Sequence, residues 1–494
     1  MKQLLLNKLF LFEKQSKLFK KKKKVLFIGI LIILSFNTLL YILTSNYDIT
    51  KIQSREHTTG FSHDKGQYFF YFYFYTGNFP LATLNKSLKY SKDDALKEIA
   101  SNGNDLIMEY KHWSRMGENL RIIAYYPNAI IRCSPENPSM KLFNAIIFIL
   151  GLILVFSSFV KINKPLLGII LVTIINLTPF FIYEIYQNEN ILALLASVFI
   201  IILGLNLKLI FNKKIKLLKL IIIAIITGLI IGLTSEIRGE TIILIVSAIL
   251  IYLFSRSFNF YLKILTLFLL VSSFYFTKIG IKNYFENNFK ETYQLVKENK
   301  GHVYDGKRIE QHLFWHPIYC GLGDFDNKYN YEWQDRVAFK YALPILKEKY
   351  NLDFKYSGDL CLDDYYDKDS LYYKYLADFS EYEEVIKTKV LSDIKSDPLW
   401  YFTIIFKRII NILSNTLPFY ILGWFFLILV YFLFKFRQIN LLKLLVVSLP
   451  LSFTPLFIYS GSNATFNSFF PFLTITIIIG LGFEYFFQIK EKRS

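Results

Sequence analysis

Charged residues are scarce in this sequence: they make up 19% of its 494 residues, whereas 53% are hydrophobic and the mean hydropathy is +0.33. This composition excludes an ordinary soluble enzyme, a disordered chain and a nucleic-acid-binding tail. The three cysteines permit at most one disulfide, and their spacing does not resemble a zinc ribbon. The sequence also lacks a Walker loop, a nucleophile elbow and a dinucleotide fingerprint, so the common signatures of nucleotide binding and serine hydrolysis are missing.

What the sequence has instead is a series of long apolar runs. A helix needs roughly 17 to 25 such residues to cross a bilayer. On this criterion the sequence predicts ten spans, at 25–44, 142–160, 165–186, 191–210, 217–234, 241–255, 260–279, 418–436, 441–459 and 467–487. The first run follows a basic leader of 24 residues and exceeds the apolar core of a signal peptide, which favours an uncleaved anchor.

The net charge of +18 is unevenly distributed along the chain. If the lysine-rich start is cytoplasmic, the inner loops and termini collect 24 of the basic residues and three of the acidic ones. This is the positive-inside pattern, and it places both termini in the cytoplasm. The charge therefore indicates orientation rather than a nucleic acid partner.

These observations predict an all-α polytopic membrane protein of about ten transmembrane helices with two mainly helical extracytoplasmic segments. The expected parts are a basic cytoplasmic or interfacial leader (1–24), the first transmembrane helix (25–44), extracytoplasmic loop 1 (45–140), a six-helix transmembrane block (142–279), a second extracytoplasmic domain (280–417), three C-terminal transmembrane helices (418–487) and a cytoplasmic tail (488–494). Residues 398–416 are expected to form an interfacial helix of the second domain.

All histidines and cysteines lie in the two outer segments. Cys320 and Cys361 share one of them and are the pair expected to form a disulfide; unpaired buried thiols are the alternative. The predicted spans, by contrast, contain essentially no ionisable residue near their centres. This disfavours an ion carrier, and their apolar composition disfavours a channel.

One charged turn lies at the predicted outer edge of the bilayer, between the fifth and sixth spans. It contains Glu236, Arg238 and Glu240. Charged side chains so close to the hydrocarbon core are energetically unfavourable unless they form ion pairs or have a functional role. The turn is therefore either an ion pair that closes a hairpin or a group that positions a substrate.

The first outer segment contains two candidate general bases, Asp64 and Glu56. A carboxylate near the membrane surface has the right chemistry to take a proton from an acceptor hydroxyl. The alternative for Asp64 is a helix cap before the aromatic run at 68–75.

The second outer segment contains His312 and His316 at helical spacing, followed by Asp324, Asp326 and Asp335. The histidines are expected to line a cleft with Trp315. Asp324 and Asp335 are further candidates for positioning substrate, and an ion pair with Arg336 is the alternative for Asp335. The pair Asp324 and Asp326 has the chemistry of a weak Mg or Mn site, although no metal is required by the spacing. The expected cofactor is accordingly none, or Mg or Mn.

Lys407 and Arg408 interrupt the apolar segment 398–416. A guanidinium binds two phosphate oxygens at once, so these residues are candidates for contact with a lipid phosphate. Snorkelling to lipid headgroups is the alternative.

The overall plan resembles the GT-C class of integral-membrane glycosyltransferases. The resemblance is carried by the cytoplasmic N-terminus, the first span, a long outer loop with an early acidic residue (Asp64 or Glu56), spans joined by short turns, and a later outer domain. It covers most of the chain as architecture and includes no long sequence signature. That class often has an acidic doublet in the first loop, whereas here Lys65 follows Asp64.

The resemblance implies transfer of a sugar from a polyprenyl-phosphate donor to a glycan, lipid or protein acceptor at the outer face of a bacterial inner membrane. Asp64 or Glu56 would be the base, and Arg238, Lys407 and Arg408 would bind the donor phosphate. Glu236, Glu240, His312 and His316 would position substrates. Two alternatives stay open: an O-antigen polymerase or ligase, and a non-enzymatic flippase or assembly scaffold.

Overall fold

The structure is a computed structural model of the chain. It describes residues 22–46, 70, 73–74, 77–78, 82–83, 106–107, 119–132, 140–177, 182, 185–186, 193–301, 303, 314–325, 328–351, 364–366, 373–375, 380–414, 430–431, 433–435 and 437–458.

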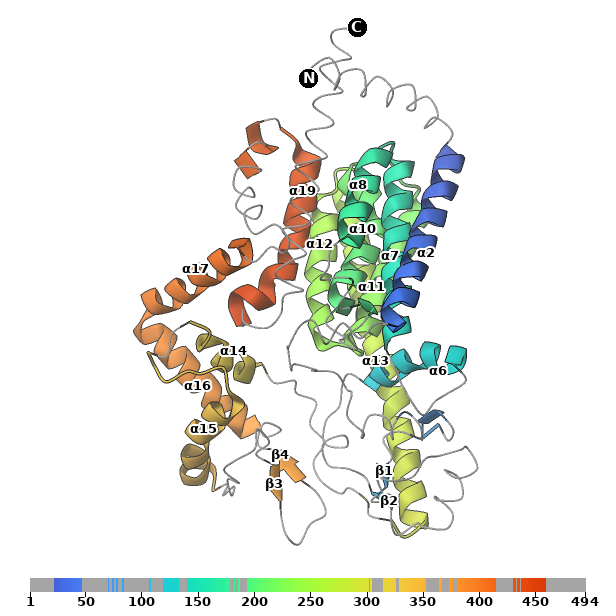
Figure 1. The fold of residues 1–494 in the computed structure, drawn as a ribbon. Coiled ribbons are helices and arrows are strands. Elements are labelled where there is room, and N and C mark those ends of the chain that lie inside the picture. The colour runs from blue at the N-terminus through green and yellow to red at the C-terminus, as the bar shows by residue number, and fades with distance from the viewer. Residues whose placement is uncertain are drawn as a thin grey trace.

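A bundle of apolar helices makes up the larger part of the described chain (Figure 1). Its members are α2 (Lys22–Asn46), α7 (Lys141–Lys161), α8 (Pro165–Asn176), α10 (Ala193–Ile210), α11 (Leu217–Ser235), α12 (Leu244–Phe254), α13 (Phe260–Glu298) and α19 (Ile439–Ser448). The short helix η4 (Gly239–Ile243) leads into α12, and η7 (Leu449–Ser452) and η8 (Thr454–Ile458) follow α19. Many large apolar side chains on the bundle surface are exposed, as expected for helices that face lipid.

Among the described residues, four helices are long and apolar enough to cross a membrane, in the ranges Lys23–Leu43, Lys141–Lys161, Leu217–Ser235 and Phe260–Glu298. They coincide with the predicted spans 25–44, 142–160, 217–234 and 260–279. The helices in the ranges Pro165–Asn176, Leu194–Ile210, Gly239–Phe254 and Ile439–Ser452 are apolar but shorter. The chain is therefore a mainly helical protein with the character of a membrane protein, and in its described part four of the ten predicted spans coincide with helices of sufficient length and apolar composition.

Two predicted spans depart from a single continuous α-helix. In the expected span 165–186, α8 ends at Asn176, and the described residues beyond its cap, Ile182, Ile185 and Tyr186, are again helical. The expected span 441–459 changes its winding after Ser448, where Pro450 falls in η7. A proline lacks the N–H that an α-helix requires, so the α-helix stops here. The chain continues with tighter winding in η7 and then wider winding in η8. The expected spans 418–436 and 467–487 lie largely or wholly outside the described residues.

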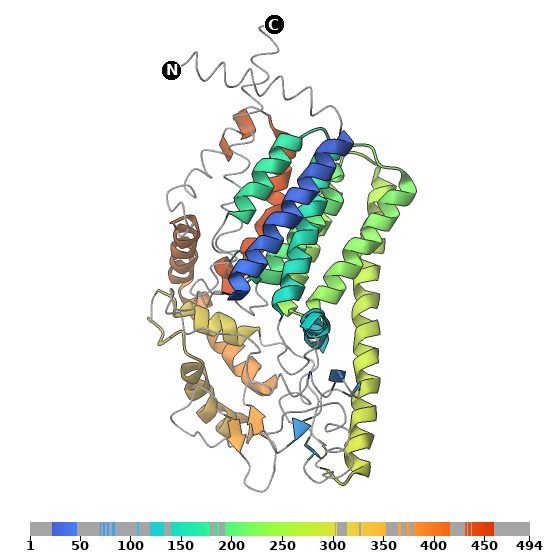
Figure 2. The same ribbon diagram turned by 45° about the vertical axis from the view of Figure 1, so that its right-hand side comes forward.

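Helix α13 is much longer than the expected span 260–279. It continues without a break to Glu298, and at 39 residues it is about 58 Å long, roughly twice the thickness of a bilayer core. Figure 2 shows its second half extending well beyond the bundle. The helix persists because Phe285, Phe289, Thr292 and Val296 form a buried stripe at helical spacing.

One end of the bundle is strongly basic. The turns between α7 and α8, α10 and α11, and α12 and α13 lie there beside the start of α2 (Figure 1). They carry Lys161, Lys164, Lys208, Lys213, Lys214, Lys216, Lys219, Arg256 and Lys263, and the described residues of these turns include no acidic side chain. Asn212 links the segments at this end, because its side-chain oxygen Oδ1 accepts hydrogen bonds from the Arg256 backbone N–H and from the Lys443 ammonium, each at 3.1 Å.

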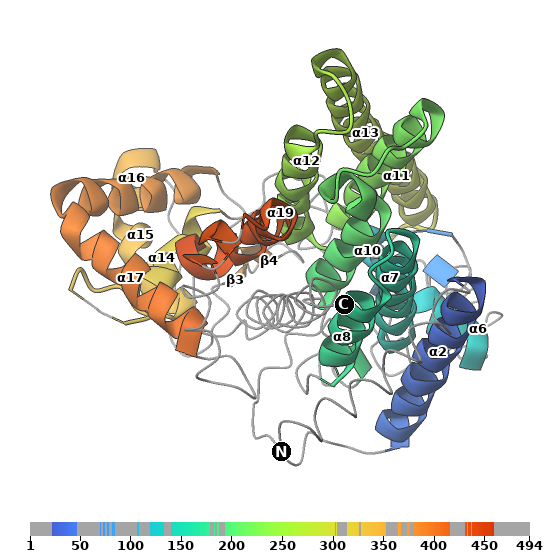
Figure 3. The same cartoon turned by 90° about the horizontal axis from the view of Figure 1, so that it is seen from above.

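A second body has its own apolar core. It consists of α14 (Trp315–Leu322), α15 (Asp335–Tyr350), α16 (Ser380–Ser396) and α17 (Pro398–Ser414), which pack around Tyr319, Phe339, Tyr382, Trp400 and Ile404. Viewed along the bundle axis, this body lies to one side of the helical bundle (Figure 3). Helix α17 covers most of the segment 398–416 and is amphipathic: it buries Trp400 and Ile404 and exposes Leu399, Phe402 and Phe406.

The remaining elements belong to the two segments, 45–140 and 280–417, that the sequence predicts to be extracytoplasmic and that are called the outer segments below. The first contains η3 (Asn119–Tyr125), α6 (Tyr126–Arg132) and an antiparallel pair of strands, β1 (Ala82–Thr83) and β2 (Leu106–Ile107). The second contains the antiparallel pair β3 (Asp364–Tyr366) and β4 (Tyr373–Tyr375). The two segments were expected to be mainly helical, and the structure adds these two short antiparallel strand pairs.

Candidate functional site

The predicted site residues fall into two groups, and the first is the turn between α11 and η4. Glu236 caps the end of α11, and the N–H groups of Ile237 and Arg238 both donate to the carbonyl oxygen of Thr234. The Glu236 side chain is buried, and its carboxylate lies 3.3 Å from the ammonium of Lys278 on α13. A buried carboxylate is tolerated there because this cation faces it.

Arg238 and Glu240 form a second ion pair on the same turn. The guanidinium donates from Nη2 to Glu240 Oε1 at 2.9 Å and from Nε to Oε2 at 3.3 Å. Both side chains are about three-quarters covered. The pair closes the turn, as the simpler interpretation of the sequence expected, and it leaves part of the guanidinium accessible to solvent.

The first outer segment packs against this turn. The Leu120 N–H donates to the carbonyl oxygen of Glu236 at 3.0 Å, and Arg121 Nε donates to the carbonyl oxygen of Ile237 at 3.2 Å. Helix η3 of outer loop 1 is therefore hydrogen-bonded to the turn that contains the predicted charged residues.

An aromatic cluster lies on the outer continuation of α13. The hydroxyl groups of Tyr73 and Tyr284 lie 3.1 Å apart, and the Phe70 and Tyr73 rings both contact Tyr126 edge to face. Burial raises the pKa of Tyr73 above its ordinary value, so its hydroxyl stays neutral. The cluster joins the beginning and the end of outer loop 1 to α13.

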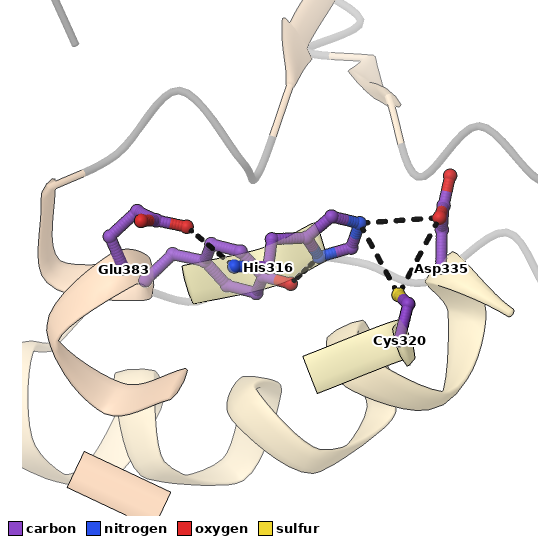
Figure 4. Close-up of polar contacts among 5 residues, drawn as sticks. His316, Cys320, Asp335 and Glu383 are labelled. Carbon is purple, nitrogen blue, oxygen red and sulfur yellow. Dashed lines mark hydrogen bonds and ion pairs between the residues drawn. The ribbon is translucent and has the colours of Figure 1, made fainter. Parts of the chain in front are cut away.

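The second group lies in the separate body, around the start of α14. His316 and Cys320 are one helical turn apart, and Asp335 reaches them from the start of α15 (Figure 4). His316 Nε2 lies 3.2 Å from Asp335 Oδ1 and 3.8 Å from Cys320 Sγ, and Sγ lies 3.9 Å from the same carboxylate oxygen. The other ring nitrogen, Nδ1, lies 2.5 Å from the hydroxyl of Tyr382 on α16.

Glu383 fixes the position of α14. Its carboxylate accepts hydrogen bonds from the backbone N–H groups of Phe314, Trp315 and His316 at 3.0, 2.9 and 3.1 Å. The first N–H groups of a helix have no partner within the helix, and a carboxylate satisfies both them and the helix dipole. Because Glu383 adjoins Tyr382, α16 orients the helix and the His316 ring together.

The pKa values of Asp335 and Cys320 are shifted in opposite directions. Hydrogen bonding to His316 holds the pKa of the Asp335 carboxyl below its usual value, with burial acting in the opposite direction. Burial raises the pKa of the Cys320 thiol, and the neighbouring Asp335 carboxylate raises it further. Cys320 is a buried free thiol, which agrees with the alternative of an unpaired thiol, and Cys361 lies outside the described residues.

Arg408 occupies a different place from the one expected. It is fully buried on α17, where its guanidinium lies 3.3 Å from Asp324 and donates to the carbonyl oxygens of Gly321, Leu456 and Ile458 at 2.6, 3.0 and 3.1 Å. In this structure the Nη atoms of Arg408 donate to protein oxygens and not to a lipid phosphate. Lys407, the preceding residue, is partly exposed. Asp324 is the buried partner of Arg408 and does not line a cleft with His316.

The structure thus brings Glu236, Arg238 and Glu240 together, and separately His316 and Asp335. The two groups belong to different apolar cores and do not form one cleft. Asp64, Glu56, His312 and Asp326 lie outside the described residues, so their predicted roles stay predictions.

Sequence reasoning missed three functional-group partners. The sequence analysis assigned no role to Lys278 or Tyr382, and it expected Cys320 to be half of a disulfide. The spacing of His316 and Cys320 by four residues was the available signal for Cys320, because it places both side chains on one helix face.

The chain was compared with protein-family models, curated proteins and solved structures, and none of these matches it. Function must therefore be argued from the residues themselves.

Proposed function

We propose that this protein is a multi-pass glycosyltransferase of a bacterial inner membrane, which moves a sugar from a polyprenyl-phosphate donor to a glycan, lipid or protein acceptor on the outer face. Its termini and its basic end would face the cytoplasm, in agreement with the positive-inside rule. About ten spans would separate that end from two outer segments, 45–140 and 280–417. The donor would be a membrane lipid, and no nucleic acid would take part.

The observation that carries this proposal is the contact between outer loop 1 and the charged turn after α11. Loop 1 is held at Glu236 and Ile237 by backbone and guanidinium hydrogen bonds, at the end of the bundle opposite the lysine-rich turns. Glu236, Arg238, Glu240 and Lys278 gather both signs of charge there. A phosphate headgroup at the membrane edge needs such cations, and an acceptor hydroxyl needs carboxylates.

Chain length connects the candidate base to this place. Asp64 precedes Phe70 by six residues, which span at most about 21 Å when fully extended. Phe70 is buried in the aromatic cluster beside Tyr126. The chain length therefore allows Asp64 to lie near this cluster, and it constrains Glu56 less tightly.

The roles follow from chemistry. Asp64 or Glu56 takes the acceptor proton, and Arg238 with Lys278 neutralises the departing phosphate, since Arg408 is engaged inside the protein. Glu236 and Glu240 hold these cations in place and position substrate hydroxyls. Lys407, which is partly exposed on α17, remains a candidate for contact with headgroups.

The experiment is a transfer assay in a deletion strain complemented with variants, read as lipid-linked sugars and finished glycan. We expect Asp64→Asn to lower transfer by about 100-fold or more, as for loss of a general base, and Arg238→Gln and Glu236→Gln to lower it by about tenfold or more. The matched control is Glu384→Gln, an exposed carboxylate on α16, which should leave transfer unchanged.

The accumulating lipid separates the alternatives. A polyprenyl-monophosphate sugar should accumulate if the proposal is right, whereas an undecaprenyl-diphosphate glycan would indicate a polymerase or ligase. Full transfer by all three variants at normal protein levels would refute the catalytic proposal and favour a flippase or scaffold.

A further inference from the structure

We propose that His316, Cys320 and Asp335 bind a single zinc ion. The three donor atoms, an imidazole nitrogen, a sulfur and a carboxylate oxygen, all lie within 4.8 Å of one another. They come from two helices that start next to each other in the fold, α14 and α15 (Figure 4). The proposal does not depend on glycosyl transfer, and it concerns the second body alone.

The distances between the donors are close to those of a tetrahedral zinc site. With ordinary zinc bond lengths, a nitrogen and an oxygen donor lie about 3.4 Å apart, and a sulfur lies about 3.6 Å from either of them. The corresponding distances here are 3.2, 3.8 and 3.9 Å. Each donor therefore needs to move by only a few tenths of an ångström.

The surroundings hold the imidazole in the orientation that a metal ligand needs. The Tyr382 hydroxyl lies 2.5 Å from Nδ1, which leaves Nε2 to face Cys320 and Asp335. The ring stacks on Phe339, with centroids 5.3 Å apart and an interplanar angle of 17°. Metal-binding histidines usually have such a partner on the second ring nitrogen, because it fixes the ring and its tautomer.

The kind of donor selects the ion. Imidazole and thiolate favour zinc and similar transition metals, whereas Mg and Mn favour oxygen donors. This group therefore differs from the Mg or Mn site that the aspartates suggested in the sequence, and Asp324 is engaged with Arg408 instead. Three protein ligands leave the fourth position for water, and solvent reaches it because the Asp335 side chain is half-exposed.

Without a metal, the contacts would be an ion pair between His316 and Asp335 at 3.2 Å and a long hydrogen bond from the Cys320 thiol to Asp335 Oδ1 at 3.9 Å. Zinc would replace both contacts by bonds to the three donor atoms, which already converge on one point. Binding of zinc forms bonds to nitrogen, oxygen and sulfur and releases the thiol proton to solvent. No group changes its oxidation state.

The test uses the full chain, purified in detergent without a polyhistidine tag, stripped with a chelator and titrated with Co²⁺ and then Zn²⁺. We expect about one Co²⁺ per chain, with visible absorption of a tetrahedral site and a thiolate-to-cobalt charge-transfer band, both abolished by an equivalent of Zn²⁺. Cys320→Ser should remove the charge-transfer band and weaken binding by about tenfold or more. Tyr382→Phe should weaken binding by about tenfold or more and keep the band.

The matched controls are Cys133→Ser and Cys361→Ser, which should keep both the band and the affinity. Loss of the band in either control, or its persistence in Cys320→Ser, overturns the assignment, as does a folded wild-type chain that binds no cobalt. If the Cys320→Ser chain does not fold, X-ray absorption at the zinc edge of the wild-type protein decides the question. One sulfur at about 2.3 Å with two or three lighter ligands is expected, and no sulfur or several sulfurs would refute the site.

Discussion

Arg408 is the side chain whose placement is the most demanding in the described part of this molecule. A fully buried guanidinium loses its hydration, and only close partners can compensate. It has them on three elements: Gly321 at the end of α14, the carbonyl oxygens of η8, and the buried carboxylate of Asp324. Burial lowers the pKa of this guanidinium, and the Asp324 carboxylate opposes that change. Arg408 thus joins the second body to the segment that follows α19.

We therefore expect Arg408→Ala to lower the free energy of unfolding by about 3–5 kcal/mol, because it leaves Asp324 buried without a counter-charge. Thermal unfolding in detergent measures this effect. Lys407→Ala, one residue away and partly exposed, is the matched control and should change stability by less than about 0.5 kcal/mol. Asp324→Asn added to Arg408→Ala should restore part of the loss. Equal stability of the two single variants would mean that Arg408 faces a ligand rather than the protein interior.

At the scale of elements, the sequence predicts helices better than their ends. Continuous apolar runs were enough to locate α2, α7, α11 and α13. The length of α13 was missed because residues 280–298 are polar overall, and their buried stripe is defined only by contact with loop 1, for example between Asn288 and the carbonyl oxygen of Gly77. The pairing of α11 with α13 depends on glycines at positions 228 and 232, a spacing that lets two helices approach closely.

Gly228→Ala tests that packing. A Cβ at this position would lie 2.0 Å from Ser273 Oγ and 2.3 Å from the Leu270 carbonyl oxygen, and the backbone oxygen cannot give way without moving α13. We expect a loss of about 1–3 kcal/mol in stability, measured as the midpoint of thermal unfolding. The control is Gly280→Ala on α13, where an added Cβ meets nothing within 4 Å. That variant should be neutral or slightly stabilising, and an equal loss in both would point to backbone effects and not to the helix contact.

At the scale of the whole molecule, the predicted site divides between two bodies. Glu236 and Arg238 belong to the bundle, while His316 and Asp335 belong to the domain of α14 to α17. The sequence predicted which residue types carry chemistry, and the side of the membrane that it assigns to them stays a prediction. It could not indicate their partners, because Asp335 lies 19 residues from His316, and Lys278 lies 42 residues from Glu236. Contacts over such separations are set by tertiary packing, which one sequence does not encode as a local pattern.

The distribution of charge leads to a prediction about orientation. Lys214 is exposed at the basic end of the bundle, and Glu298 is exposed at the far end of α13. If basic turns stay in the cytoplasm, Glu298→Cys should react with a membrane-impermeant maleimide in intact spheroplasts, whereas Lys214→Cys should react only after lysis. Cys133 and Cys361 are replaced by serine to remove background, and the buried Cys320 is kept. Labelling of Lys214→Cys before lysis, with Glu298→Cys protected, would invert the orientation and place both groups of candidate residues in the cytoplasm, where an outer-face transferase cannot use them.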